Sequence, residues 1–202
     1  MALLSRRATR SKGIEAPAGA KVVLHVGCGP PDHNSLHEDF RSPEWHEVRL
    51  DVDPGVRPDI VASIADMSPV PDASVDAIYS HHNIEHVFAH EVPQVLAEFL
   101  RVLKPGGEAL IGTPDLEAVG KALAAGRLEE VYYRAEVGDI SALDVLYGLR
   151  RDIEQGREYM AHRTGFTGRT LGRKLSQAGF AQVQVARTPV CDLWARGRRP
   201  AR

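Results

Sequence analysis

Short apolar runs alternate along the chain with segments whose apolar residues recur at helical spacing. In the clearest helical segment, residues 92–103, the apolar positions follow i, i+3, i+4, i+7 spacing and are Val92, Val95, Leu96, Phe99, Val102 and Leu103. The strand-like runs around it are Lys21–Val26, His46–Val52, Asp59–Ser63, Val75–Ser80 and Glu108–Thr113. Strands that alternate with helices are typical of an α/β fold with a mostly parallel sheet.

The second half of the chain extends this pattern. Asp115 suits the N-cap of a helix, and Thr167 precedes a further helix that Gly179 ends. Residues 127–165 mix charged residues, tyrosines and glycines, and we predict irregular helices that form a lid there rather than sheet. Two closing strands are expected over residues 181–186 and 189–194. The whole pattern predicts a doubly wound, seven-stranded, mostly parallel sheet with helices on both faces.

Length and composition indicate an ordinary globular domain. The 202 residues suit a single domain over residues 19–195, between basic tails at residues 1–18 and 196–202. The net charge of −2 favours neither nucleic acid nor an anionic membrane as a partner. No apolar run approaches the ~20 residues of a membrane span, and two cysteines give no disulfide framework. A cytoplasmic protein is therefore expected, while the sequence indicates no oligomeric state.

A glycine turn, Gly27-Cys28-Gly29, follows the first predicted strand. Glycine lets the backbone approach a ligand closely because it has no Cβ. Asp51 ends the second strand, where a carboxylate can accept both hydroxyls of a ribose. In a G-x-G-x-x-G dinucleotide motif the third glycine would stand at Asp32, after two prolines. The turn therefore suits an adenosyl ligand without phosphates better than a dinucleotide.

Four segments together resemble the successive motifs of class I S-adenosylmethionine-dependent methyltransferases, of the type 11-like kind. They are VVLHVGCGP, LDVDP, DASVDAIYSHHNIEHV and EFLRVLKPGGEALIGTPDL, between Lys21 and Asp115, with a weaker echo in LGRKLSQAGFAQVQVA. The resemblance implies a Rossmann-like methyltransferase fold, S-adenosylmethionine as cofactor, and methyl transfer to an acceptor that we expect to be a small molecule. The matching cofactor positions are His25, Gly27, Cys28, Gly29, Asp51, Val52, Ile64, Asp66 and His81.

His82 and His162 are the candidates for a general base, which a hydroxyl or protonated amine acceptor requires. His162 can also be an ordinary surface histidine, and Cys28 can be a small residue that only packs in the fold. His25 stands where the family commonly has an acid. Either its imidazole accepts the same hydrogen bond from the cofactor, or it points away and forms hydrogen bonds within the fold.

His82–His86 matches the H-x-x-E-H pattern of a zinc peptidase helix, and His90 continues the spacing. The pattern starts directly after a strand, and Pro93 fits a helix that begins later. We therefore expect His82 to be non-helical and predict no metal site. Two other functions remain open: a cofactor-binding partner protein without catalysis, supported by His25 and the basic termini, and an NAD-dependent dehydrogenase, disfavoured by Asp32.

Overall fold

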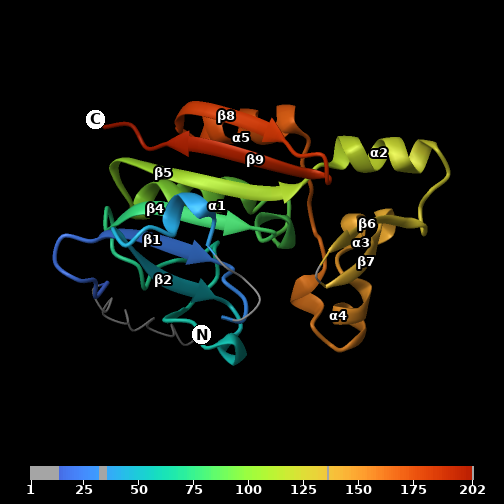
Figure 1. Ribbon diagram of the computed structural model, residues 1–202. Helices are drawn as coiled ribbons and strands as arrows, with labels where there is room; N and C mark the ends of the chain where they lie inside the picture. Colours follow the sequence, from blue (N-terminus) through green and yellow to red (C-terminus); the bar gives the residue numbers. More distant parts are fainter. Residues whose placement is uncertain (1–13, 32–35, 136, 202) are drawn as a thin grey trace, which may run out of the picture.

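The computed structural model describes residues 14–31, 36–135 and 137–201, and within these ranges it confirms the predicted sheet (Figure 1). Its seven strands lie in the order β3-β2-β1-β4-β5-β9-β8. Their bounds are β1 Lys21–Val26, β2 Trp45–Asp51, β3 Ile60–Val61, β4 Val75–His81, β5 Leu103–Pro114, β8 Ala181–Arg187 and β9 Asp192–Arg198. The first five strands run parallel to one another, and β9 is antiparallel to both β5 and β8.

Two helices pack on one face of the sheet, and the main hydrophobic core lies between these helices and the strands. The apolar stripe predicted for residues 92–103 forms α1, Val92–Val102, with Pro93 in its first turn. The second helix, α5 (Gly168–Ala178), begins with a capping box between Thr167 and Thr170. Phe99 of α1 is fully buried, which contributes about 1.5–3 kcal/mol to folding.

A smaller apolar cluster occupies the other face. Val23, Ala77, Tyr79 and Leu110 pack there against Phe40 of the short 3₁₀ helix η1, Glu38–Phe40. Because side chains alternate along a strand, His25 shares this face with Val23 and not the face of Leu24 and Val26.

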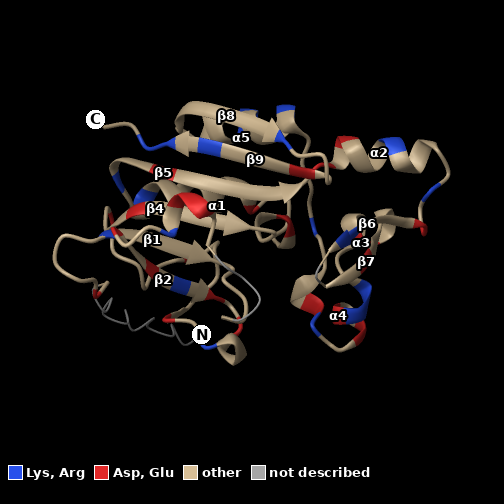
Figure 2. Ribbon diagram, in the orientation of Figure 1, with Lys and Arg blue, Asp and Glu red and all other residues tan. Residues whose placement is uncertain are grey.

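The last strand extends beyond its expected limits. Residues 189–191 belong to a turn in which the Thr188 N–H donates to the Asp192 carbonyl, and Cys191 has φ +73°. As a result β9 starts at Asp192 and continues to Arg198, into the residues predicted as a basic tail. Figure 2 shows basic residues on this last part of β9. Arg196 forms ion pairs with Glu108 (2.9 Å) and Asp39, which hold the strand end on the sheet.

The prediction that residues 127–165 contain no sheet is wrong. This insertion contains the antiparallel hairpin β6 (Val131–Ala135) and β7 (Gly138–Ser141), followed by α3 (Ala142–Tyr147), α4 (Arg150–Glu154) and the 3₁₀ helix η4 (Glu158–Met160). It shares an apolar cluster with α2, Leu116–Ala124. Figure 1 shows the insertion beyond the carboxyl ends of the parallel strands, where such sheets bind ligands.

Asp115 caps α2 as predicted, since its side chain accepts a hydrogen bond from the Glu117 N–H. None of the helices within the described ranges is both long and apolar enough to cross a membrane.

Candidate functional site

A cavity of about 820 Å³ lies between the strand ends and the insertion. Gly27 and Gly29 after β1 and Asp51 at the end of β2 form one part of its wall. The end of β4 and the turn after it form a second part, and residues of the insertion form a third. These two parts contribute His81, His82, Asn83, His86, Tyr159 and Met160. Segments distant in sequence thus enclose one volume.

The glycine turn is held by the carboxylate of Asp51. Oδ2 of Asp51 accepts a hydrogen bond from the Gly29 N–H (2.9 Å), and Oδ1 accepts one from the Asp53 N–H (2.9 Å). Gly27 has φ +64°, and a Cβ there would lie 2.4 Å from Cγ of Asn83. Backbone conformation and space both require glycine at this position. Asp51 is buried and lines the cavity.

Val52, Ile64 and His81, which the sequence resemblance places at the cofactor, also line the cavity. The ring of His81 stacks on Trp194 at 4.7 Å, and burial lowers the pKa of this histidine to about 3. Its imidazole is therefore neutral at physiological pH.

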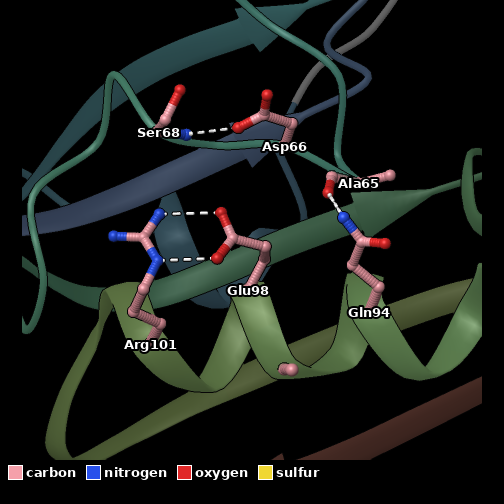
Figure 3. A pocket seen from close by; sticks show the side chains of 7 residues that line it. Ala65, Asp66, Ser68, Gln94, Glu98 and Arg101 are labelled. Atoms are coloured by element: carbon pink, nitrogen blue, oxygen red, sulfur yellow. Dashed lines mark hydrogen bonds and ion pairs between the residues drawn. The ribbon is translucent and has the colours of Figure 1, made fainter. Parts of the chain in front are cut away.

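Asp66 lies elsewhere, in a separate depression beside α1 (Figure 3). Its Oδ1 accepts a hydrogen bond from the Ser68 N–H (3.2 Å). In the same depression Arg101 binds the carboxylate of Glu98 through two hydrogen bonds of 2.7 and 2.8 Å. The turn from Ser63 to Asp66 directs Ile64 into the large cavity and Asp66 away from it.

His25 and Cys28 do not line the cavity either. The His25 side chain is 0% exposed, its Nδ1 lies 2.7 Å from Oε1 of Glu47, and its ring packs on Tyr79. This is the second of the two arrangements considered for His25, in which the imidazole points away and forms hydrogen bonds within the fold. Cys28 is fully buried, and burial raises the pKa of its thiol to about 11.

His82 lies at the cavity wall between two carboxylates. Its Nδ1 is 3.3 Å from Oε1 of Glu85, and its Nε2 is 3.5 Å from Oδ1 of Asp192. Burial opposes the charged imidazole, but the hydrogen bond and charge of Glu85 dominate and raise the pKa of His82. His82 has φ +47°, and the 3₁₀ helix η3 begins only at Ile84, so the prediction that His82 is non-helical is confirmed.

Glu85 is almost completely buried, at 1% exposure. Its Oε2 accepts a hydrogen bond from the hydroxyl of Thr113 (3.0 Å). Burial raises the pKa of a carboxyl group, but here the hydrogen bond and charge of His82 dominate and lower it to about 2. Glu85 is therefore ionised inside the protein.

His162 lies behind the wall, beside His86 of η3. The two rings are 4.9 Å apart, and Nδ1 of His162 donates to the carbonyl of Val145 (2.9 Å). Burial lowers the pKa of His162. The structure therefore brings this residue to the turn after β4, although 76 positions separate it from His86.

Asn83 is a cavity residue that sequence reasoning did not assign to the site, and Tyr159, for which the sequence left a cavity wall and an ordinary surface position open, also lines the cavity. Nδ2 of Asn83 is buried and has no hydrogen-bond partner among the described residues. Tyr159 donates from its hydroxyl to Oδ2 of Asp53 (2.9 Å), which joins the insertion to the end of β2. The position of Asn83 directly after β4 was a usable signal, whereas no local pattern marks Tyr159.

Comparison with known proteins agrees with this geometry. Residues 24–111 match a family model described as a methyltransferase domain. An uncharacterized 37.1 kDa protein in transposon Tn4556 of Streptomyces fradiae is 27% identical over 181 residues, which cover 81% of this chain and 44% of that protein. A SAM-dependent methyltransferase from Methanosarcina mazei aligns with a TM-score of 0.60 at 16% identity, over 91% and 94% of the two chains.

The 1,6-didemethyltoxoflavin-N1-methyltransferase of Burkholderia thailandensis, solved with 1,6-didemethyltoxoflavin and S-adenosylhomocysteine, aligns with a TM-score of 0.53. Its identity is 15%, over 90% of this chain and 72% of that one. Residues 24–111 thus match a methyltransferase domain, and the chain has the fold of SAM-dependent methyltransferases of known structure. The family match and the fold together support a class I S-adenosylmethionine-dependent methyltransferase. The chain spans less than half the length of its S. fradiae relative.

S-adenosylmethionine is the cofactor of this class, and the residues present fit it. The turn at Gly27 is a cradle that a Cβ would fill. The buried amide of Asn83 offers N–H donors to a ligand carboxylate, and Asp51 offers acceptors to a ribose.

Proposed function

We propose that this chain transfers a methyl group from S-adenosylmethionine to a small-molecule acceptor bound in the same cavity. The observation that carries the proposal is that a single wall joins the glycine turn and Asp51 to His82 and His86. Its volume falls in the range of about 300–1,000 Å³ that is typical of small-molecule sites. The B. thailandensis neighbour, named for methylating a small heterocycle, supports an acceptor of that size.

The cofactor end of the cavity is assigned to the residues at the strand ends. Asp51 accepts hydrogen bonds from the ribose, and Gly27 and Gly29 leave room for the methionyl part. Val52 and Ile64 border the adenine. His81 adds a neutral ring beside the position of the sulfonium, so it does not repel that positive charge. His25, Cys28 and Asp66 have no part in this assignment because their side chains lie outside the cavity.

The acceptor end is assigned to the turn after β4. The cofactor supplies a methyl group already activated by its sulfonium. The residues of the chain orient the acceptor in line with that methyl group and exclude water. Neutral His82 donates from Nδ1 to Glu85, so its Nε2 accepts the proton that the acceptor releases, and Glu85 and Asp192 stabilise the resulting imidazolium. The products are the methylated acceptor and S-adenosylhomocysteine.

The interpretation as an inactive partner protein loses one of its two grounds, because His25 does not line the cavity. Calorimetry with S-adenosylhomocysteine, with NADH as the comparison ligand, tests the cofactor assignment. A methyl-transfer screen over small acids, amines and sugars then tests the acceptor. We expect His82→Gln to lose turnover and keep cofactor affinity, and His90→Gln, at an exposed position, to keep both. Binding of NADH in place of S-adenosylhomocysteine would contradict the proposal.

A further inference from the structure

Three side chains that could bind a metal ion meet beside the cavity. Glu85 and His86 lie on η3, and His162 lies in the segment before α5. One possible ligand atom from each lies within 4.8 Å of the other two. Backbone hydrogen bonds join the two segments: the N–H groups of Arg163 (2.8 Å) and Thr164 (3.1 Å) donate to the Glu85 carbonyl. The three residues are therefore held in place by the fold.

Hydrogen bonds fix the orientation of both imidazoles. Nδ1 of His86 lies 3.3 Å from the Ala161 carbonyl, and Nδ1 of His162 lies 2.9 Å from the Val145 carbonyl. A carbonyl only accepts, so Nδ1 is the protonated nitrogen in each neutral ring. Nε2 of each ring is left with a free lone pair. Metal-binding histidines have this arrangement, in which the second ring nitrogen donates to a carbonyl or carboxylate.

The carboxylate of Glu85 is supported in the same way. Its two oxygens contact Nδ1 of His82 (3.3 Å) and the hydroxyl of Thr113 (3.0 Å). Each oxygen keeps a further lone pair, and carboxylates that bind metals are themselves held by such hydrogen bonds. A second group, His81, His82 and Asp192, also has its ligand atoms close together. It is the weaker candidate because Nδ1 of His82 faces Glu85 and its Nε2 is the nitrogen that the proposed methyl transfer needs as a base.

We propose that Glu85, His86 and His162 bind a divalent transition-metal cation, for which Zn²⁺ is the best match. Two imidazoles and one carboxylate are a ligand set that zinc accepts, and three protein ligands leave a coordination position open. This proposal departs from the sequence-based prediction of no metal site, which rested on His82 being non-helical. Here the third ligand is His162, which only the tertiary structure supplies.

His86 also lines the cavity, so a bound cation would lie at its wall. The open position is then available to an oxygen or nitrogen of the acceptor, and this last step rests on the proposed methyl transfer. Cation binding itself does not rest on it.

Zinc analysis after equilibrium dialysis of the chelator-treated full chain tests the site. We expect one Zn²⁺ per chain, with affinity reduced at least tenfold in His86→Asn and in His162→Asn. His90→Asn is the matched control, because His90 is exposed and lies outside the group. Equal affinity of the wild type and His162→Asn would overturn the proposal. So would loss of zinc in Asp192→Asn with retention in His162→Asn, since the cation would then occupy the second group.

Two measurements keep the test independent of misfolding and of enzyme activity. X-ray absorption of the zinc-loaded wild type should show two imidazole ligands per zinc, and a site without imidazole would overturn the proposal. Calorimetry with S-adenosylhomocysteine on the same variants reports whether the cofactor end is intact. Absence of zinc in a chain that still binds this ligand removes the metal site and leaves the proposed function standing. Zinc binding by a chain that does not bind S-adenosylhomocysteine would support the metal site and contradict the proposed function.

Discussion

The two ends of the cavity are built in different ways. At the proposed cofactor end, Gly27, Gly29 and Asp51 lie directly after β1 and at the end of β2, and each is positioned by the strand that leads to it. At the proposed acceptor end, Glu85 and His162 come from segments 77 positions apart, and Tyr159 reaches Asp53 from the insertion. The first end depends on backbone geometry at neighbouring strands, whereas the second depends on long-range contacts. Substitutions should therefore act differently at the two ends.

The largest effect is expected at Gly27. In Gly27→Ala the turn must move, because the Cβ would meet Asn83 and φ is +64°. Strain of this kind costs about 1–3 kcal/mol, and the overlap of the Cβ with Asn83 adds to it, so S-adenosylhomocysteine affinity should fall by about 100-fold. Calorimetry measures the affinity. Gly106→Ala is the matched control, since Gly106 has φ +81° with open space around it. Gly106→Ala should lower the stability and leave the affinity unchanged. Equal S-adenosylhomocysteine affinity in the two variants would mean that the turn at Gly27 does not shape the cofactor end.

Asp51→Asn should have the next largest effect. Loss of charge-assisted hydrogen bonds to the ribose should weaken S-adenosylhomocysteine binding by about 1.5–3 kcal/mol. Asp59→Asn serves as control, because Asp59 accepts a backbone hydrogen bond from Arg49 of β2 (2.8 Å) but lies outside the cavity. Unchanged affinity in Asp51→Asn would remove this residue from the cofactor site.

Tyr159→Phe tests whether the insertion contributes to the cofactor end. It removes the hydrogen bond to Asp53, so affinity for S-adenosylhomocysteine should fall by about 0.5–1.5 kcal/mol if the insertion closes over the ligand. Tyr147→Phe is the control, because Tyr147 is exposed and its hydroxyl forms no hydrogen bond with the described residues. Identical affinities in the two variants would mean that the insertion does not act as a lid.

Thiol labelling compares Cys28 in the glycine turn with Cys191, which packs against α2 and the insertion, and it needs no ligand. We expect the smallest difference here. Burial raises the pKa of Cys28 and of Cys191 to about 11, so only about one thiol in a thousand is ionised at pH 8. Both should react slowly in the folded chain, faster as pH rises towards 11, and rapidly after unfolding. Cys28→Ser and Cys191→Ser isolate each site. Rapid labelling of Cys191 alone at pH 8 would show that the insertion and α2 open while the glycine turn stays closed.

The sequence by itself determined the features that depend on local periodicity. The apolar stripe of α1, the sheet strands and the glycine turn all follow from spacing that the backbone imposes within a few residues. Asp51 was found in the same way, because the end of a parallel strand places a side chain at the ligand-binding edge. For these features neighbours in sequence are neighbours in space.

The tertiary structure decided which partner each polar side chain meets. His25 turned to Glu47 because alternation along β1 directs it to the face of Tyr79. Asp66 fell outside the cavity through the direction of a single turn, and β6 and β7 paired across a segment without a clear strand pattern. His162 reached Glu85 and His86 only because chain folding brought the segment before α5 against η3. Periodicity specifies the face of an element, while contacts between distant segments depend on how the elements pack together.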